Sequence, residues 1–341
     1  MLKKLTDCPL IFSLELPVEG SEHSNCYFVI SEGEMLVIDP PLYKPGFLAM
    51  YDEAMNELAG KVHKISVFLT HTHGELARKA PRMPDVNGSI YMTRDEYEEL
   101  ASHSLRSYKK TRFKREGFPK EALARLFPQK SGKESGREYQ AVFVEEGTLI
   151  QIGSLIFQCM LTPGPSKGHC CLLLQKKGFL FAGVLLPAEG LPDADIWNDK
   201  VSSLDKLLES LEKLRRLPVT TVFPARGAAY RGCAERVETI SAQYYMRLVE
   251  LYQLIHDCPG ENAYELSRKF GHRRGRIERA AAGNQWSAMK ATMACLIMLR
   301  NNRYVVVARK EKNVCNYPGS VRFADANSNG RMRRHKELII Q

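Results

Sequence analysis

The sequence predicts an α/β protein, on three observations. Short apolar runs alternate with amphipathic stretches over most of the chain, which is the pattern of strands that alternate with helices. The chain has 341 residues, of which 44% are hydrophobic, so it can bury a sizeable core in roughly two domains. Its longest apolar runs stay well below the roughly 20 residues that a transmembrane helix needs. We therefore expect a globular protein that does not cross a membrane.

The first part of the chain alternates strand and helix signals. We predict strands over 34–38, 65–69 and 89–92, where β-branched and apolar residues dominate, and helices over 45–58 and 94–100. The first of these strands ends at Asp39, which precedes a proline. The second runs into THTHGELA, in which His71 and His73 are separated by one residue. Two histidines at a strand end resemble the beginning of a metal site.

The middle of the chain predicts antiparallel pairing followed by a helix. Strands are expected over 147–152, 155–161, 169–175 and 178–186, and the connections between them are short enough for hairpins. Leucines at 204, 207, 208, 211 and 214 recur at helical spacing and mark a helix with one buried face. A final strand of this part is predicted over 219–223.

The C-terminal part has a different character. Helices are predicted over 261–270, 276–282 and 286–300, followed by a strand over 303–308. Three helices and a β wing suggest a winged-helix-like domain over 256–310. The longest of these helices is unusually apolar, so we expect it to pack on the rest of the chain or on a second copy in a homodimer. The basic remainder, 311–341, is expected to be a poorly ordered tail.

The net charge of +10 is unevenly distributed. The segment 106–137 contains eleven Lys or Arg residues and three acidic ones, and we treat about 104–138 as a basic helical insertion. One interpretation is a binding surface for a phosphate-bearing partner such as a CoA ester or nucleic acid. The other is a helical face that is simply solvated.

Cysteine usage and the N-terminus indicate the compartment. The nine cysteines include no CxxC pair and no regular framework, so we expect free thiols in a reducing environment. The first twenty residues lack the apolar core and cleavage site of a signal peptide. Both observations favour a cytoplasmic protein.

Five motifs occur in a fixed order along the chain: NCYFVISEGEMLVIDP (25–40), THTHGELA (70–77), LTPGPSKGHCCLLL (161–174), FLFAGVLL (179–186) and VFPARG (222–227). Together they resemble the metallo-β-lactamase fold superfamily, and within it the glyoxalase II-like hydrolases that carry a winged-helix tail. The resemblance implies a four-layer αββα sandwich, with 1–255 as the metallo-β-lactamase-like domain. It also implies structural roles at strand ends and turns for Asp39, Thr162 and Gly164.

Hydrolases of this family use two metal ions, usually zinc, which lower the pKa of a bound water toward about 7. Carried over by position, the resemblance implies that this chain keeps the first two ligands of site one, His71 and His73. The third ligand position holds Pro165, and the bridging aspartate has become Val184. Neither side chain has a lone pair to offer. The position of His169 is expected to lie behind the metal.

The second site has lost more of its ligands. Its aspartate position holds Glu75, and its histidine positions hold Leu76 and Arg226. A guanidinium would bring a permanent positive charge to the place of a dication. We therefore predict that Arg226 is buried at the vacated metal position and pairs with Glu75, directly or through Asp39, because an unpaired buried charge would cost several kcal/mol.

The leading functional hypothesis is a hydrolase homologue with a degenerate metal site, which lacks dinuclear hydrolysis and retains ligand binding. No cofactor is expected in that case. The alternative is an active thioester or phosphodiester hydrolase with one zinc ion at His71 and His73, completed by Glu75, His169 or the Cys170 thiolate. A third hypothesis is a nucleic-acid-binding protein. Whether the chain is an enzyme stays open at this point.

Overall fold

We describe the protein from a computed structural model. The structure describes residues 2–7, 9–17, 23–41, 45–72, 86–101, 104–127, 140–198, 200–273, 282–308 and 320–323. The chain forms two compact units. Unit 1 comprises Met1–Leu105, Gly132–Asp193 and Lys206–Glu238, and unit 2 comprises Arg106–Ser131, Ala194–Asp205 and Thr239–Gln341.

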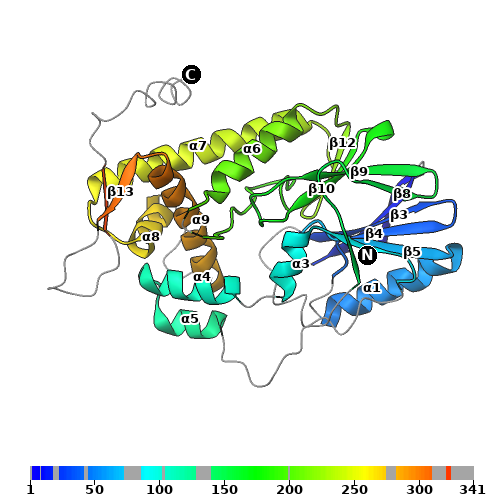
Figure 1. Cartoon of the computed structure of the whole chain (residues 1–341), viewed down its shortest axis with the longest axis horizontal. Coiled ribbons are helices and arrows are strands. Elements are labelled where there is room, and N and C mark those ends of the chain that lie inside the picture. Colours follow the sequence, from blue (N-terminus) through cyan, green and yellow to red (C-terminus); the bar gives the residue numbers. More distant parts are fainter. Residues whose placement is uncertain are drawn as a thin grey trace. The chain divides into compact units, whose positions relative to one another are not determined.

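A seven-stranded sheet forms one half of unit 1, in the order β1-β2-β3-β4-β5-β6-β7 (Figure 1). Its strands are β1 Leu2–Asp7, β2 Leu10–Leu16, β3 Ser24–Ser31, β4 Glu34–Ile38, β5 Lys64–Phe68, β6 Ile90–Met92 and β7 Ala141–Phe143. The first four pair antiparallel, and β4 to β7 pair parallel. The helices α1 (Pro45–Leu58) and α3 (Arg94–Ala101) follow β4 and β6, with the 3-10 turn η1 (Ala59–Lys61) after α1.

A second sheet has the order β12-β11-β10-β9-β8. Its strands are β8 Leu149–Ile152, β9 Leu155–Leu161, β10 Cys170–Leu174, β11 Phe179–Gly183 and β12 Thr221–Pro224. The antiparallel run from β8 to β11 confirms the prediction, whereas β12 joins parallel to β11 after helix α6 (Ser203–Arg215). The short 3-10 turn η2 (Gln175–Lys177) connects β10 to β11. The predicted strand over 178–186 is three residues too long, because Gly183 has a positive φ of 53° and ends β11.

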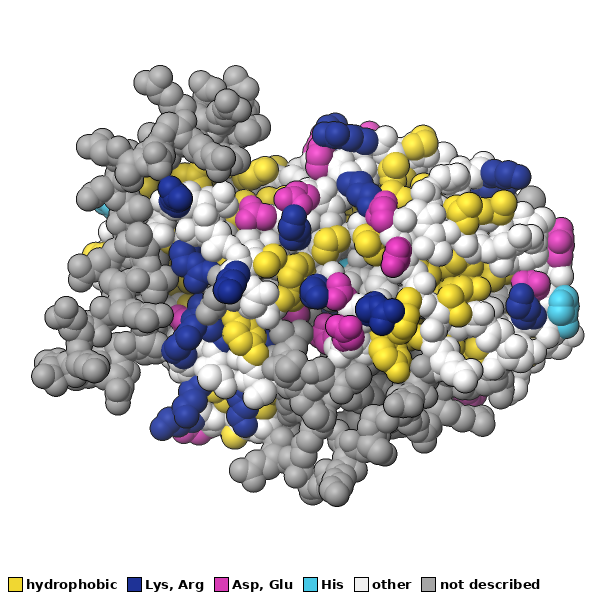
Figure 2. Space-filling model, in the orientation of Figure 1, with side chains coloured by type: hydrophobic (Ala, Val, Ile, Leu, Met, Phe, Trp, Pro, Cys, Tyr) yellow, Lys and Arg dark blue, Asp and Glu magenta, His cyan; other side chains and the backbone are white. Residues whose placement is uncertain are grey.

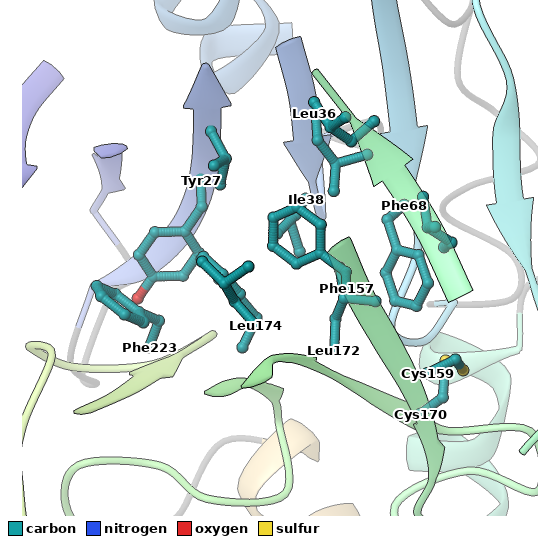
Figure 3. Packing of buried hydrophobic residues seen from close by; sticks show 14 of the residues in the cluster. Tyr27, Leu36, Ile38, Phe68, Phe157, Cys159, Cys170, Leu172, Leu174 and Phe223 are labelled. Atoms are coloured by element: carbon teal, nitrogen blue, oxygen red, sulfur yellow. The ribbon is translucent and has the colours of Figure 1, made fainter. Parts of the chain in front are cut away.

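The two sheets pack face to face through a buried apolar layer. Aromatic side chains from both sheets meet there: Tyr27 makes edge contacts with Phe181 and Phe223, whose rings stack with centroids 4.9 Å apart. Figure 3 shows part of this layer, including Leu36, Ile38 and Phe68 from the first sheet and Phe157, Leu172 and Leu174 from the second. Alternate residues of each strand thus face the other sheet.

Helices cover the outer face of each sheet. The apolar face of α1, including Phe47, Tyr51 and Leu58, packs on the first sheet. Four of the five leucines of the α6 stripe are buried, at 204, 207, 211 and 214. Ser210 on that helix donates a hydrogen bond of 2.8 Å to the carbonyl of Pro163 after β9. The order helix, sheet, sheet, helix confirms the predicted four-layer αββα sandwich.

Unit 2 is built from helices and a small β-ribbon. It contains α4 (Ser104–Arg115) from residue 106, α5 (Lys120–Leu126), α7 (Cys233–Asp257) from residue 239, α8 (Ala263–Arg273), α9 (Ala282–Asn301), β13 (Val305–Ala308) and β14 (Ser320–Phe323). The two strands pair antiparallel. The predicted helix over 276–282 and the tail from 324 onward lie largely outside the described residues, so the winged-helix interpretation stays a prediction.

An aromatic cluster joins the basic insertion to the C-terminal helices within unit 2. Trp286 of α9 stacks on Phe113 of α4 with ring centroids 3.6 Å apart, and it makes edge contacts with Phe118 and Phe127. The apolar residues of α9, such as Met293, are buried in the same cluster. Their apolar character therefore has a partner within the chain, and a homodimer stays a prediction.

Two further expectations concern the described part of the chain. Its seven cysteines, at 26, 159, 170, 171, 233, 258 and 295, are all free thiols. None of its helices combines the length and apolar character that crossing a bilayer requires.

Candidate functional site

The ends of five strands converge at one edge of the sandwich in unit 1. The amide of Asp39, after β4, donates to the carbonyl of Phe68 at the end of β5, at 3.0 Å. The two sheets are joined there by a hydrogen bond of 2.9 Å from the amide of Cys170 to the carbonyl of Thr70. The amide of Ala225, after β12, donates to the carbonyl of Gly183 at 2.7 Å. The predicted site residues Asp39, His71, His169 and Arg226 all lie on these strand ends.

Asp39 and Thr70 form a largely buried clamp beside His71. Thr70 donates two hydrogen bonds to the Asp39 carboxyl, from its amide at 2.8 Å and from its hydroxyl at 2.6 Å. Asp39 adopts φ 53°, a left-handed conformation that aspartate tolerates better than most residues. The Thr70 hydroxyl also lies 2.8 Å from Nδ1 of His71. The carboxyl therefore positions the histidine through Thr70.

The proton positions in this clamp follow from donor counting. When Asp39 is ionised, the single Thr70 O–H is committed to it, so Nδ1 of His71 must carry a proton and donate to the Thr70 oxygen. Nε2 of His71 then presents a lone pair. Burial, with a contribution from the positive charge of Arg226, lowers the pKa of His71 to about 4. His71 is thus neutral at pH 7.

The same burial acts on Asp39 in the opposite sense. It raises the pKa of Asp39 to about 7, although the two hydrogen bonds from Thr70 oppose the rise. Desolvation disfavours the charged form of either group, and it therefore raises the pKa of an acid and lowers the pKa of a base.

His169 lies deep beside this clamp. Its ring centroid is 6.0 Å from that of His71, and its Nδ1 lies 2.8 Å from the hydroxyl of Thr162. Its Nε2 is buried without a hydrogen-bond partner among the described residues. Burial, and then the neighbouring His71, lower the pKa of His169 well below its ordinary value. The structure thus brings the two imidazoles together as neutral bases.

A second carboxylate, Glu96 of α3, ties together the two loops that frame the site. It accepts hydrogen bonds from the amide of Thr72 at 2.6 Å and from its hydroxyl at 2.7 Å, and it accepts another from the Ser166 hydroxyl. Glu96 is fully buried, and burial raises its pKa, although these hydrogen bonds oppose the rise. The loop that carries His71 and the loop that carries Pro165 are therefore held by one side chain.

Glu96 was not among the residues that the sequence pointed to. Thr93 and Glu96 have the T-x-x-E spacing of a helix capping box, and the Glu96 amide does donate to the Thr93 hydroxyl at 3.3 Å. The Glu96 side chain instead turns to Thr72 and Ser166. The local sequence shows the capping-box spacing of Thr93 and Glu96, but only the folded structure shows that the Glu96 side chain binds Thr72 and Ser166.

Two glycines hold these loops close together. A Cβ on Gly183 would lie 2.5 Å from Nε2 of His169 and 2.6 Å from the Thr70 hydroxyl. A Cβ on Gly164 would lie 2.5 Å from the Cβ of Leu207. Both backbones approach side chains more closely than any other residue type allows.

Arg226 departs from its prediction. Its side chain is exposed, and no ion pair joins it to a carboxylate among the described residues. The prediction that its guanidinium is buried is therefore wrong. The physical reason is its place after β12: its backbone bridges to Ser24 at the edge, from which a long side chain reaches solvent. Glu75, its predicted partner, lies outside the described residues.

The donor set fits two metal ions poorly. Pro165 lies in the loop between β9 and β10 and Val184 directly follows β11, where the resemblance expects ligands, and neither side chain has a donor atom. Asp39 is engaged by Thr70. Among the described residues, no three His, Cys, Asp or Glu side chains are grouped as metal ligands. His73, Glu75 and Leu76 lie outside these residues, so their predicted roles stay predictions.

Comparison with known proteins supports the same scaffold. The profile of the Metallo-beta-lactamase superfamily matches residues 20–226. The lactamase-like protein nscB of Aspergillus fumigatus is 26% identical over 144 residues, which cover 41% of this chain and 42% of that protein. An atrochrysone carboxyl ACP thioesterase of the same species is 25% identical over 122 residues, or 34% of this chain and 36% of that protein. The chain thus matches less than half the length of these relatives.

Two solved structures share the fold over nearly the whole chain. A metallo-beta-lactamase family protein from Thermus thermophilus superposes with a TM-score of 0.71 at 20% identity, covering 92% of this chain and 98% of that one. A beta-lactamase domain protein from Burkholderia ambifaria superposes with a TM-score of 0.75 at 17% identity, covering 95% of this chain and 93% of that one. The strand-end site, the four layers and the profile match agree, and the chain belongs to the metallo-beta-lactamase superfamily.

Proposed function

We propose that this protein is a member of the superfamily that lacks dinuclear metal hydrolysis and binds an anionic ligand at the strand-end site. One observation carries the proposal: the positions that would supply the third and the bridging ligand, in the loop after β9 and directly after β11, hold Pro165 and Val184. Without those donors the second metal ion has no bridge and the first has an incomplete shell. A shared fold does not imply a shared function, so we base the proposal on the residues of the site and not on the family scaffold.

Two features of the site support a ligand-binding role. The Asp39 and Glu96 clamps keep the loops ordered through hydrogen bonds between protein groups. The exposed Arg226 lies close enough to His71 to lower its pKa, and so places a permanent positive charge at this edge. A guanidinium is well suited to a carboxylate or phosphate group. A phosphate-bearing ligand such as a CoA ester is therefore the proposed class.

The test compares the parent protein with a variant in which donors are restored. Zinc is titrated into the parent and into a Pro165→His/Val184→Asp variant, in competition with a chromophoric chelator. We expect no tight stoichiometric binding by the parent and a gain in the variant. We also expect the parent to leave CoA thioesters and phosphodiesters unhydrolysed. Hydrolysis that a chelator abolishes and His71→Ala removes would overturn the proposal.

A second candidate has an observation of its own. When Asp39 is ionised, the Thr70 contact leaves Nε2 of His71 with a lone pair, and burial keeps the ring neutral, as a metal ligand requires. An active thioester or phosphodiester hydrolase with one zinc ion at His71 and His73 is therefore the alternative, and one named relative is a thioesterase. One equivalent of zinc bound by the parent, together with hydrolysis, would favour this candidate.

A further inference from the structure

The positive charge of this protein resides in unit 2. That unit contains 28 of the 49 Lys and Arg residues and 13 of the 39 Asp and Glu residues, which gives it a net charge of +15. Unit 1 contains 21 Lys and Arg residues and 26 Asp and Glu residues, which gives it a net charge of −5. A field of one sign on one compact unit attracts polyanions.

Within unit 2 the structure separates cations that stabilise the fold from those that face solvent. Lys109 lies 2.6 Å from a carboxylate oxygen of Asp195, and both side chains are largely buried. Arg112 pairs with Glu116 in the same way. On α8, Arg268 lies 3.7 Å from Glu265. These cations already have carboxylate partners.

Four other cations on α4 and α5 differ from these. Lys110, Lys114, Lys120 and Arg125 are exposed, and none has a carboxylate partner among the described residues. We call these four residues the basic face. Figure 2 shows Lys and Arg side chains on the surface that carries α4 and α5. Glu121 is an exposed acidic residue of α5 beside them.

The basic face is directed outward because the opposite side of both helices is packed. Phe113 of α4, Phe118 in the connecting turn and Leu123 of α5 are buried in the aromatic cluster around Trp286. Lys110 and Lys114 are one turn apart on the exposed side of α4. The packing of unit 2 therefore holds these cations in place on its surface.

The composition of this surface favours one class of partner. The exposed large apolar side chains of the described part are Val142, Leu149, Ile156, Val201 and Met246, and none of them belongs to α4 or α5. Protein interfaces and membrane-surface helices need apolar anchors. A phosphate backbone needs only cations.

We infer that the basic face of α4 and α5 binds the phosphate backbone of double-stranded nucleic acid without reading its sequence. Phe113 of α4 is buried inside the cluster and Tyr108 packs against it, so these rings offer no platform on which bases could stack. The basic face belongs to unit 2 and the strand-end site to unit 1, and the inference does not depend on the function proposed for that site.

The test uses the full chain and a fluorescent 20-base-pair duplex of mixed sequence. The basic-face variant is Lys110→Gln, Lys114→Gln, Lys120→Gln and Arg125→Gln. The matched control is Lys61→Gln, Lys176→Gln, Lys177→Gln and Arg231→Gln, which removes four exposed cations of unit 1. Circular dichroism and thermal melting confirm that both variants fold.

The salt dependence of affinity decides the outcome. If all four side chains contact phosphates, the slope of log K against log salt should become shallower by about 3 to 4 in the basic-face variant. The control should keep the parental slope. Equal losses in both variants would show that only net charge matters, and an unchanged slope would show that the face makes no contact. Equally tight binding of polyglutamate would point to an acidic protein instead. Each of these three results would overturn the inference.

Discussion

At the scale of single residues, Glu96 is the side chain on which the order of the site depends most. It accepts hydrogen bonds from Thr72 and Ser166, which belong to the two loops around His71 and Pro165. A glutamine at this position would lose the charge and turn N–H groups toward hydroxyl and amide donors. Hydrogen bonds to charged groups contribute about 1.5–3 kcal/mol each.

We predict that Glu96→Gln lowers the free energy of unfolding by roughly 3 kcal/mol or more, measured by urea denaturation. The control is Glu98→Gln on the same helix, whose exposed side chain should change stability by less than about 0.5 kcal/mol. Equal effects of the two substitutions would show that the buried carboxylate is not a clamp.

Asp39 gives a prediction with a definite sign in pH. Its folded pKa is about 7, whereas the unfolded group titrates near 3.8. The folded protein therefore holds the proton that the unfolded chain releases, and the stabilisation is complete below about pH 4 and lost as the pH rises to 7. Asp39→Asn cannot titrate. The stability of the variant relative to the parent should rise between pH 4 and 7, by up to about 4 kcal/mol.

The measurement for Asp39 is a series of urea unfolding curves at several pH values. A constant offset between the variant and the parent across this range would mean that Asp39 titrates normally. A difference that falls as the pH rises would mean that its folded pKa is lowered, which would contradict the role of burial.

At the scale of elements, Gly183 ends β11 where no side chain fits. Gly183 and Gly190 both have positive φ values, 53° and 69°, but a Cβ at Gly190 would meet no atom within 4 Å. Each alanine substitution costs about 1–2 kcal/mol for the backbone conformation. Only Gly183→Ala adds the clash with His169 and Thr70.

We therefore predict that Gly183→Ala destabilises the protein by at least about 1–3 kcal/mol more than Gly190→Ala, the range for overpacking a core. Thermal unfolding of both variants measures the difference. Similar costs would mean that the end of β11 can move away from the two side chains.

The elements also show what the sequence could predict. The hairpins from β8 to β11 and the leucine face of α6 were predictable because turn residues and spacing act over a few positions. The strands β1 and β2 and the long helix α7 were not predicted. The residues Thr72 and Ser166 escaped notice because their shared partner, Glu96, is distant in sequence.

Arg226 illustrates the limit of carrying a site over by position. The resemblance correctly placed the residue at the edge that carries His71, and its charge does affect that histidine. Which way a long side chain turns depends on the space around the strand end, and a motif does not encode that space. The predicted burial of Arg226 was therefore wrong, whereas its pairing with Glu75 stays a prediction.

At the scale of the whole molecule, the fold of the family can be kept without the dinuclear metal centre of its hydrolases. The chain folds as a metallo-beta-lactamase sandwich, with hydrogen-bonded carboxylates ordering the strand ends, and it concentrates positive charge in unit 2. Neither feature requires a dinuclear centre. The central claim is that too few ligands remain to hold even one metal ion stoichiometrically.

Elemental analysis of protein purified without a histidine tag tests that claim most directly. We predict well under one equivalent of zinc, iron or manganese per chain, because Pro165 and Val184 supply no donor atoms. One or more equivalents per chain, lost in a His71→Ala/His73→Ala double variant, would contradict it.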